Sequence, residues 1–347
     1  MIVGPPAGTM AGQQSSLRAP NVLEVRRFKL ECGVTGAWFA GEMAVFIGAD
    51  RSLMQVPIGG RERLVAAHDD VILVSAGDGS RVATAGSDGR VLAIEPDGSI
   101  KELTSFDRNR WVSTIAVGDA NVAYGIGRDL FVYLGDGSKH QRRSSSPVTA
   151  MQFSPDARTL AFAGRDGICL WSPETDKERH LRAGPGSTTS LCFSPDGLLL
   201  AETFYEPLLA VRGVEDDSIL VMNGPPARVR SVSWASRSPT LLRSGVRHLV
   251  VCPILNKGGQ LSTLPRLFAP YREQVTVVAH HPQQPLATVG YADGLVLLVR
   301  LVDGAEIVLK PPDGGTVAAL AWSPLGRGLA IGGMDGQAIL FVIDFAQ

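Results

Sequence analysis

The sequence predicts an all-β protein, a closed β-propeller of eight four-stranded blades. Two segments, residues 148–171 and 317–343, show the repeating unit most clearly. Each holds three runs of alternating apolar residues, separated first by a Ser-Pro-rich turn and then by a Gly-x-Asp-Gly turn. Alternation with a period of two marks β-strands, and Asp-Gly between two such runs indicates a tight hairpin.

Copies of this unit recur along the whole chain when the large residue before the first turn is used as an anchor. The anchors are Phe39, Ala76, Val117, Phe153, Phe193, Trp234, His280 and Trp322. The mean step between them is about 40 residues, close to the period of about 40–45 that is typical of propeller blades. Eight anchors predict eight blades; seven blades is the alternative, because seven is the commoner number.

A fourth strand is expected before each copy, and the two chain ends indicate how the ring closes. Candidate fourth strands lie at residues 63–67, 100–105, 178–182, 218–222 and 306–310. Only residues 344–347 follow the last copy, whereas residues 27–32 alternate without a blade of their own. We expect this N-terminal strand to complete the last blade, which removes an exposed sheet edge. Residues 22–347 would then form the propeller, and residues 1–21 a flexible tail.

The Ser-Pro turns resemble those of the WD40 repeat family. The resemblance rests on residues 153–156, 193–197 and 322–324 and extends over about residues 22–347. It implies a propeller that binds proteins. The family's Trp-Asp dipeptide is degenerate here, since only Trp171 stands near that place, and the usual Gly-His pair is absent, with His68 as the closest approach. These departures put the family's bracing hydrogen bonds in doubt, but not the propeller.

A narrower resemblance supplies a hypothesis about a partner. The chain resembles stand-alone WD40 proteins of alphaproteobacteria at residues 66–70, 110–112, 231–234, 281–282 and 289–301. Members of that group are often encoded beside cobalamin-synthesis-W-like GTPases linked to zinc supply. The resemblance implies an accessory factor in zinc homeostasis that works with a GTPase metallochaperone, and it defines no biochemical activity.

Composition narrows the class of partner and the compartment. The formal net charge is −1, so no global field draws the chain to nucleic acid or to an anionic membrane. The N-terminus lacks a signal-peptide pattern, and no apolar run reaches membrane-spanning length. The four cysteines lie in apolar runs without zinc-type spacing: Cys32, Cys169, Cys192 and Cys252. We expect reduced, buried thiols in a cytoplasmic protein that binds neither nucleic acid nor membrane.

No residue stands out as a catalyst, cofactor ligand or metal ligand. Serines and aspartates that recur once per blade serve the turns, whereas a hydrolase needs one distinctive nucleophile with its own base. His280 and His281 are neighbours on a strand and point to opposite faces, and the other histidines are far apart in sequence. We expect no enzyme and no cofactor. A ligand-binding or enzymatic propeller with a site at the channel mouth is the alternative, which His280 keeps open although the first strands are mostly small and apolar.

Residues that break the repeat at surface turns are the candidates for partner binding, because loops on a rigid scaffold tend to carry recognition. They are Arg110, Trp111, Phe204, Tyr205, Arg247, His248, Tyr291 and Met334. Aromatic residues and arginine are enriched in interface hot spots, and these turns should share one face of the ring. We therefore expect a non-catalytic protein–protein interaction scaffold. For each residue the alternative is an incidental surface or packing role. The insertion at residues 253–274 is either a lengthened outer strand or a docking loop.

Overall fold

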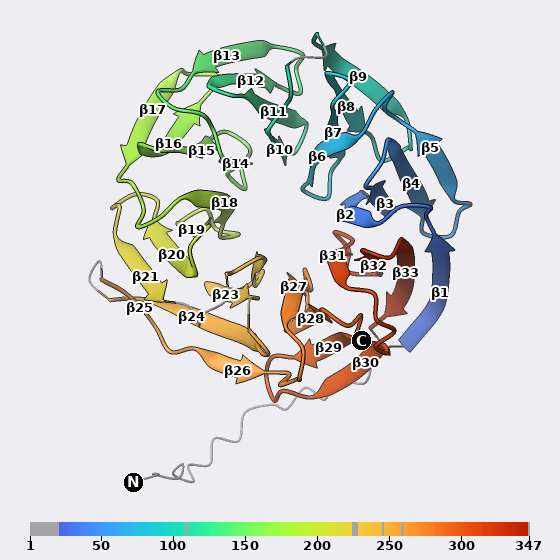
Figure 1. Ribbon diagram of the computed structural model, residues 1–347. Helices are drawn as coiled ribbons and strands as arrows, with labels where there is room; N and C mark the ends of the chain where they lie inside the picture. Colours follow the sequence, from blue (N-terminus) through green and yellow to red (C-terminus); the bar gives the residue numbers. More distant parts are fainter. Residues whose placement is uncertain (1–20, 108–109, 224–227, 245, 258–259, 346–347) are drawn as a thin grey trace.

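The computed structural model confirms the predicted fold class. It describes residues 21–107, 110–223, 228–244, 246–257 and 260–345. The regular elements of this part are strands, arranged in eight antiparallel sheets that form a ring (Figure 1). Among these residues no helix is long and apolar enough to cross a membrane.

Blades 1 to 4 each contain four strands that follow one another in sequence from the centre of the ring to its rim. Blade 1 consists of β2 (Val34–Ala40), β3 (Met43–Gly48), β4 (Ser52–Pro57) and β5 (Arg63–Ala66). Blade 2 consists of β6 (Ile72–Gly77), β7 (Val82–Gly86), β8 (Arg90–Ile94) and β9 (Ile100–Ser105). Blade 3 consists of β10 (Thr114–Gly118), β11 (Asn121–Ile126), β12 (Asp129–Tyr133) and β13 (Lys139–Arg143). Blade 4 consists of β14 (Ala150–Phe153), β15 (Leu160–Gly164), β16 (Gly167–Ser172) and β17 (Lys177–Leu181).

Blades 5 and 7 repeat this order, whereas blades 6 and 8 depart from it. Blade 5 consists of β18 (Thr188–Phe193), β19 (Leu199–Phe204), β20 (Leu208–Gly213) and β21 (Ile219–Asn223). Blade 6 consists of β22 (Val232–Trp234), β23 (Thr240–Arg243), β24 (Leu249–Lys257), β25 (Gln260–Thr263) and β26 (Arg266–Phe268). Blade 7 consists of β27 (Val275–His280), β28 (Leu286–Tyr291), β29 (Val296–Arg300) and β30 (Glu306–Lys310). Blade 8 consists of β31 (Val317–Trp322), β32 (Gly328–Gly333), β33 (Gln337–Asp344) and β1 (Asn21–Lys29).

The predicted fourth strands exist as β5, β9, β17, β21 and β30, each within a residue or so of the expected bounds. Each one is hydrogen-bonded to the third strand of the copy before it, so it completes that sheet and not the sheet of the copy that follows. This arrangement lets every blade form from consecutive antiparallel hairpins, for which short turns suffice.

The ring closes as predicted, through the N-terminal strand. Strand β1 pairs antiparallel with β33, with Phe28 opposite Ala338 and Lys29 opposite Gln337. The strand spans Asn21–Lys29 and therefore begins earlier than the predicted segment 27–32. Apart from Asn21, the predicted tail (residues 1–21) lies outside the described residues.

Apolar side chains fill the space between neighbouring blades. One cluster joins Leu30 and Leu340 of blade 8 to Phe39 and Phe46 of blade 1, across the closure. Similar clusters join the other blades, so each blade is packed on both sides by its neighbours. The closed ring is a stiff support for the loops at its two faces.

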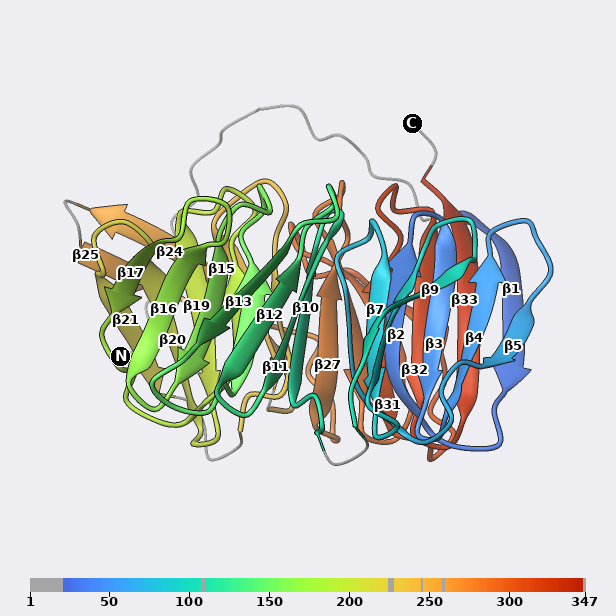
Figure 2. The ribbon, with the colours of Figure 1, turned by 90° about the horizontal axis from the view of Figure 1, so that it is seen from above.

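Blade 6 contains the insertion, which is a lengthened and broken outer strand. The nine-residue strand β24 pairs through Ile254–Lys257 with β25 and through Leu249–Val251 with β26. Pro265 lies between the two pieces and cannot donate a backbone hydrogen bond to the ladder. Figure 2 shows the resulting hairpin at the periphery of the ring.

The two faces of the ring differ in the loops that form them. We call face A the side built from the loops that connect successive blades and from the turns between the second and third strands of each blade. These two sets of loops are hydrogen-bonded together, as between Ser144 N and Arg128 O at 2.8 Å and between Met334 N and Thr316 O at 2.9 Å. Face B carries the remaining turns. Figure 2 shows the ring edge-on, with the two faces above and below.

Candidate functional site

Six of the eight predicted partner-binding residues have an exposed or half-buried side chain in face A loops. Trp111 is 63% exposed, Tyr205 69% and Met334 58%. Arg110 and Arg247 are also exposed, and His248 is half-buried. Arg110 and Trp111 lie in the loop between β9 and β10, and the other four lie in turns between second and third strands. The topology therefore gathers them on one face, distributed over blades 3, 5, 6 and 8.

The expectation that Phe204 and Tyr291 lie at the surface is wrong, because both side chains are fully buried. Each ends the second strand of its blade and turns inward against the loop that enters the blade. A Cβ atom on Gly184 would lie 2.6 Å from the Phe204 ring, so that glycine makes room for the ring. The Tyr291 hydroxyl donates a 2.6 Å hydrogen bond to Ala269 O. These aromatic residues hold the entering loops to their blades.

A bracing network of the kind that the sequence left in doubt is present in blade 2. The buried His68 ring places Nδ1 3.1 Å from the Asp88 carboxylate and Nε2 2.9 Å from the Thr84 hydroxyl. Burial lowers the pKa of His68, although Asp88 acts in the opposite direction. Burial alone would raise the pKa of Asp88, but hydrogen bonds from the backbone of Arg90 and Asp69 and from His68 outweigh it and lower that pKa. A neutral ring therefore donates from Nδ1 to Asp88 and accepts at Nε2 from Thr84.

Blade 5 is braced by a buried ion pair. Arg212 Nε lies 3.0 Å from Glu202 Oε2, and the two side chains are 1% and 0% exposed. Thr188 Oγ1 donates to Glu202 Oε1 at 2.6 Å, and Asp217 accepts from Arg212 at 3.3 Å. Most of the polar atoms are satisfied within the blade, so this cluster is a structural element and not a reactive site.

Arginine side chains cover aromatic rings at three places in the face A loops. The guanidinium carbon lies 5.5 Å from the ring centre in the pair Arg110–Phe106, 5.0 Å in Arg228–Tyr205 and 5.6 Å in Arg272–Tyr271. Cation–π contact holds both partners in place and leaves one side of the guanidinium available. The sequence analysis did not single out Phe106 or Arg228, and it included Tyr271 and Arg272 only as part of the insertion at residues 253–274. Arginine directly follows its aromatic partner in the pair Tyr271–Arg272, whereas the partners of the other two pairs are separated in the sequence.

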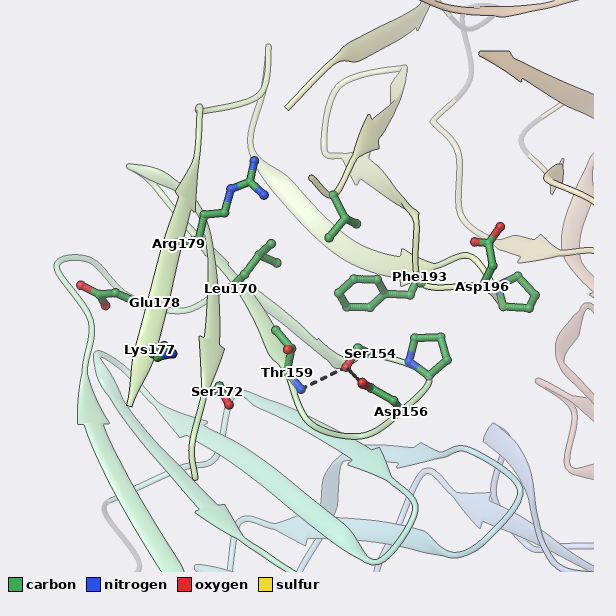
Figure 3. Close-up of a pocket in the computed structure, with 14 residues that line it drawn as sticks. Ser154, Asp156, Thr159, Leu170, Ser172, Lys177, Glu178, Arg179, Phe193 and Asp196 are labelled. Atoms are coloured by element: carbon green, nitrogen blue, oxygen red, sulfur yellow. Dashed lines mark hydrogen bonds between the residues drawn. The ribbon is translucent and has the colours of Figure 1, made fainter. Parts of the chain in front are cut away.

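One cleft lies on face B between blades 4 and 5 (Figure 3) and has a volume of about 650 Å³. Leu170 and Phe193 contribute apolar lining, and the outer strand of blade 4, with Lys177 and Arg179, lies along one side of the cleft. Ser154 lines the cleft, but its hydroxyl donates to Asp156 at 2.5 Å and accepts from Thr159 N at 3.0 Å. The serine therefore stabilises its turn, as the sequence predicts.

A second cleft of about 410 Å³ lies between blades 3 and 4 and contains donors that could hold a metal ion. Among the described residues, Cys169, Glu178 and His180 form a group whose ligand atoms all lie within 4.8 Å of one another. Burial raises the pKa of the Cys169 thiol, and the nearby Arg142 charge opposes that shift. The sequence analysis assigned these side chains no common site.

Of the two neighbouring histidines at the end of β27, His281 has a structural role, whereas the buried Nδ1 of His280 has no hydrogen-bond partner among the described residues. Burial lowers the pKa of His280 and of His281 to about 4. His281 Nε2 donates to Gly326 O at 3.1 Å, and its Nδ1 accepts from the backbone of Gln283 and Gln284. Both nitrogens of the neutral His281 ring are therefore engaged in holding turns on face B.

The fold defines the class of the protein as an eight-bladed β-propeller. Residues 137–172 match the family model described as WD domain, G-beta repeat. This match spans β13 to β16, which is one outer strand and the three strands after it, and with the ring it supports the WD40 propeller family. No curated protein sequence matches the chain.

Among solved structures, the chain is similar to the crystal structure of the computationally designed Ika8 protein. The TM-score is 0.71 at 17% sequence identity, and the match covers 90% of this chain and 97% of the designed one. At this identity the likeness concerns the fold alone.

Proposed function

We propose that this propeller is a non-catalytic protein–protein interaction scaffold and that partners bind face A. The observation that carries the proposal is the exposure of two large aromatic side chains, Trp111 and Tyr205, on the loops of a closed ring. Such side chains are preferred anchors in protein interfaces, where their burial contributes most of the binding energy. WD40 propellers are generally non-catalytic scaffolds.

The surroundings of these side chains support the same function. Arg228 stacks on Tyr205, so part of the side-chain entropy that binding would cost is already lost in the free protein. The loops are anchored to a stiff ring, which favours a partner that binds a preformed surface. The formal net charge of −1 favours proteins over nucleic acid or an anionic membrane.

The experiment compares two triple variants in affinity purification from the native cells. Trp111→Ala, Tyr205→Ala and Arg247→Ala together alter face A. The matched control changes three apolar residues of face B, Leu198→Ala, Val302→Ala and Leu325→Ala, whose side chains are 57%, 70% and 51% exposed. We expect a stoichiometric protein partner that is retained by wild type and by the control and lost from the face A variant.

Equal recovery by both triple variants would contradict the use of face A. Recovery of the chain alone, over varied salt and growth conditions, would contradict the scaffold function itself. Circular dichroism and thermal unfolding of both variants must match wild type, so that a lost partner reports on the surface and not on misfolding.

The accessory role beside a zinc-linked GTPase is supported by the sequence resemblance at residues 66–70 and 289–301, and it would make that GTPase the recovered partner during zinc starvation. The alternative from another class is a small-ligand-binding or enzymatic propeller with a site at the channel mouth. The face B cleft has a volume within the range of about 300–1,000 Å³ of ligand pockets, but it lies between blades 4 and 5 and extends to the outer strand of blade 4. The proposal includes a cytoplasmic location, supported by the reduced cysteines that the sequence predicts.

A further inference from the structure

The cleft between blades 3 and 4 contains three different metal-binding side chains from one hairpin. Cys169 lies on β16, and Glu178 and His180 lie on β17. Sγ of Cys169 lies 4.0 Å from Glu178 Oε2, and His180 Nε2 lies 3.6 Å from Glu178 Oε1. Tetrahedral Zn²⁺ with bonds of about 2.0–2.3 Å keeps its ligand atoms about 3.3–3.8 Å apart. The three ligand atoms lie within 4.8 Å of one another, so the side chains must approach by up to about 1.5 Å to bind one ion.

Strand pairing accounts for this convergence. Cys169 and His180 are direct partners across the β16–β17 ladder, and Glu178 precedes His180 by two residues. Cross-strand partners point to the same face of a sheet, as do residues two apart on one strand. All three side chains therefore project from the same face of blade 4, toward the outer strand of blade 3.

The burial of the group suits a metal ion that enters from solvent. The Cys169 side chain is buried at the base, whereas the side chains of His180 and Glu178 are 69% and 39% exposed. Cys169 and His180 both line the cleft. A thiolate, an imidazole and a carboxylate together favour Zn²⁺ over Mg²⁺ or Ca²⁺, which prefer oxygen ligands only.

A cation of the protein itself already occupies this donor group. Arg142, on β13 of blade 3, forms an ion pair with Glu178. It also lies 3.6 Å from Asp176 and 5.7 Å from the Trp171 ring centre. The guanidinium can turn toward these two neighbours and release Glu178, and its charge opposes any second cation at the site.

We propose that Cys169, Glu178 and His180 form a Zn²⁺ site, for which the Arg142 guanidinium competes. Binding forms a zinc–thiolate bond, and the Cys169 proton passes to solvent. The three protein ligands leave one tetrahedral position for water or for a donor group from a bound partner.

The test uses the untagged full-length protein, reduced and freed of metal, with Co²⁺ as the spectroscopic probe and Zn²⁺ as the competitor. A thiolate ligand gives Co²⁺ a charge-transfer band in the near ultraviolet, which His and carboxylate ligands do not produce. We expect one equivalent of Co²⁺ to generate this band, Zn²⁺ to abolish it, and Cys169→Ser to remove it. Cys252→Ser, which changes a cysteine in the core of blade 6, should retain it.

His180→Ala keeps the test valid if Cys169→Ser does not fold, because the His180 side chain is mostly exposed. It should weaken Zn²⁺ binding by at least about tenfold, because substitution of a residue that only hydrogen-bonds to a metal ligand already costs about that much affinity. His140→Ala, on the neighbouring outer strand β13, is the matched control and should leave binding unchanged. Arg142→Gln should tighten binding by about fivefold, the value of a strong surface ion pair.

Absence of the cobalt band in wild type, or its persistence in Cys169→Ser, would overturn the site. Zn²⁺ affinity that is unchanged in His180→Ala would overturn it as well. Unchanged or weaker binding by Arg142→Gln would overturn the competition.

Discussion

Blades 2 and 5 are both stabilised where the loop that enters the blade meets the end of its second strand. In each blade an aromatic ring fills this place, but the ring comes from the loop in blade 2 and from the strand in blade 5. In blade 2 the bracing group is a His68 ring that reaches from the entering loop onto Gly86 of the second strand. A Cβ atom on Gly86 would lie 2.5 Å from His68 Nδ1. In blade 5 the aromatic ring comes from the second strand, as Phe204, and lies over Gly184 of the entering loop. The ring and the glycine have exchanged sides, and the space between loop and strand is filled in both blades.

The polar partners differ along with the rings. The two blades have the same register at this place, since Ile72 lies opposite Gly86 and Thr188 lies opposite Phe204. Thr84 and Glu202, each two residues earlier on the second strand, therefore occupy equivalent positions. Thr84 contributes a neutral hydroxyl to the His68 network, whereas Glu202 contributes a buried charge that needs Arg212. The same position in the fold accepts either a neutral or a charged side chain. The loss of stability on removing one partner differs between the blades, because an unpaired buried charge is far more destabilising than an unpaired hydroxyl or imidazole.

The largest effect is expected for Arg212→Ala, which leaves the Glu202 carboxylate buried without its cation. We expect the free energy of unfolding to fall by about 3–5 kcal/mol, the usual cost of breaking a buried ion pair on one side. Urea unfolding followed by tryptophan fluorescence measures it. Arg158→Ala, an exposed arginine in the neighbouring blade, is the control and should change stability by less than about 0.5 kcal/mol. A loss of about 1 kcal/mol or less for Arg212→Ala would show that solvent reaches Glu202.

A smaller effect is expected for His68→Ala in blade 2. The substitution leaves Asp88 with its backbone donors from Asp69 and Arg90, so only part of the network is lost. We expect a loss of about 1–3 kcal/mol, the cost of leaving buried polar groups unsatisfied. The measurement is the same unfolding series at neutral pH. A loss as large as that of Arg212→Ala would remove the energetic distinction between the two blades.

The repeat made the ring and its closure predictable from sequence, because both depend on spacing. Ser-Pro and Asp-Gly turns recur at blade length, and a lone alternating segment at the N-terminus can pair only with the last blade. The position of β1 was less well predicted, since the polar residues of Asn21–Lys29 hide a strand whose exposed edge faces solvent.

The burial of Phe204 and Tyr291 could not be read from local sequence. Both stand in place of the usual glycine at the end of the second strand, next to a turn. An aromatic residue beside a turn is expected to be exposed at the surface. Whether the aromatic side chain points inward depends on whether the entering loop supplies a ring of its own. That loop precedes the aromatic residue by a whole strand pair, so the local sequence does not reveal it. The convergence of Cys169 and His180 depends in the same way on strand register, which spacing along the chain does not reveal.

Acid should weaken the histidine-braced blades. Burial holds the pKa of His280 and His281 at about 4 against an ordinary 6.5, and it also lowers that of His68. The unfolded chain therefore binds more protons between these values, so the free energy of unfolding falls as the pH drops from about 6.5 to about 4. Unfolding series at several pH values measure this slope. His68→Ala and His281→Asn should each flatten it, and a slope unchanged in both would contradict the assignment.

The smallest effect is expected when both charges of blade 5 are replaced together, by Glu202→Leu with Arg212→Met. Apolar residues of similar volume remove the desolvation cost of both ions along with their attraction, and such exchanges are often neutral or stabilising. We expect the free energy of unfolding of the double variant to lie within about 1 kcal/mol of the wild-type value at neutral pH, well above the value for Arg212→Ala. This result would show that the ion pair of blade 5 is conditionally required: each charge is needed only because the other is present. A double variant as unstable as Arg212→Ala would instead show that Thr188 and Asp217 depend on these charges for their own hydrogen bonds.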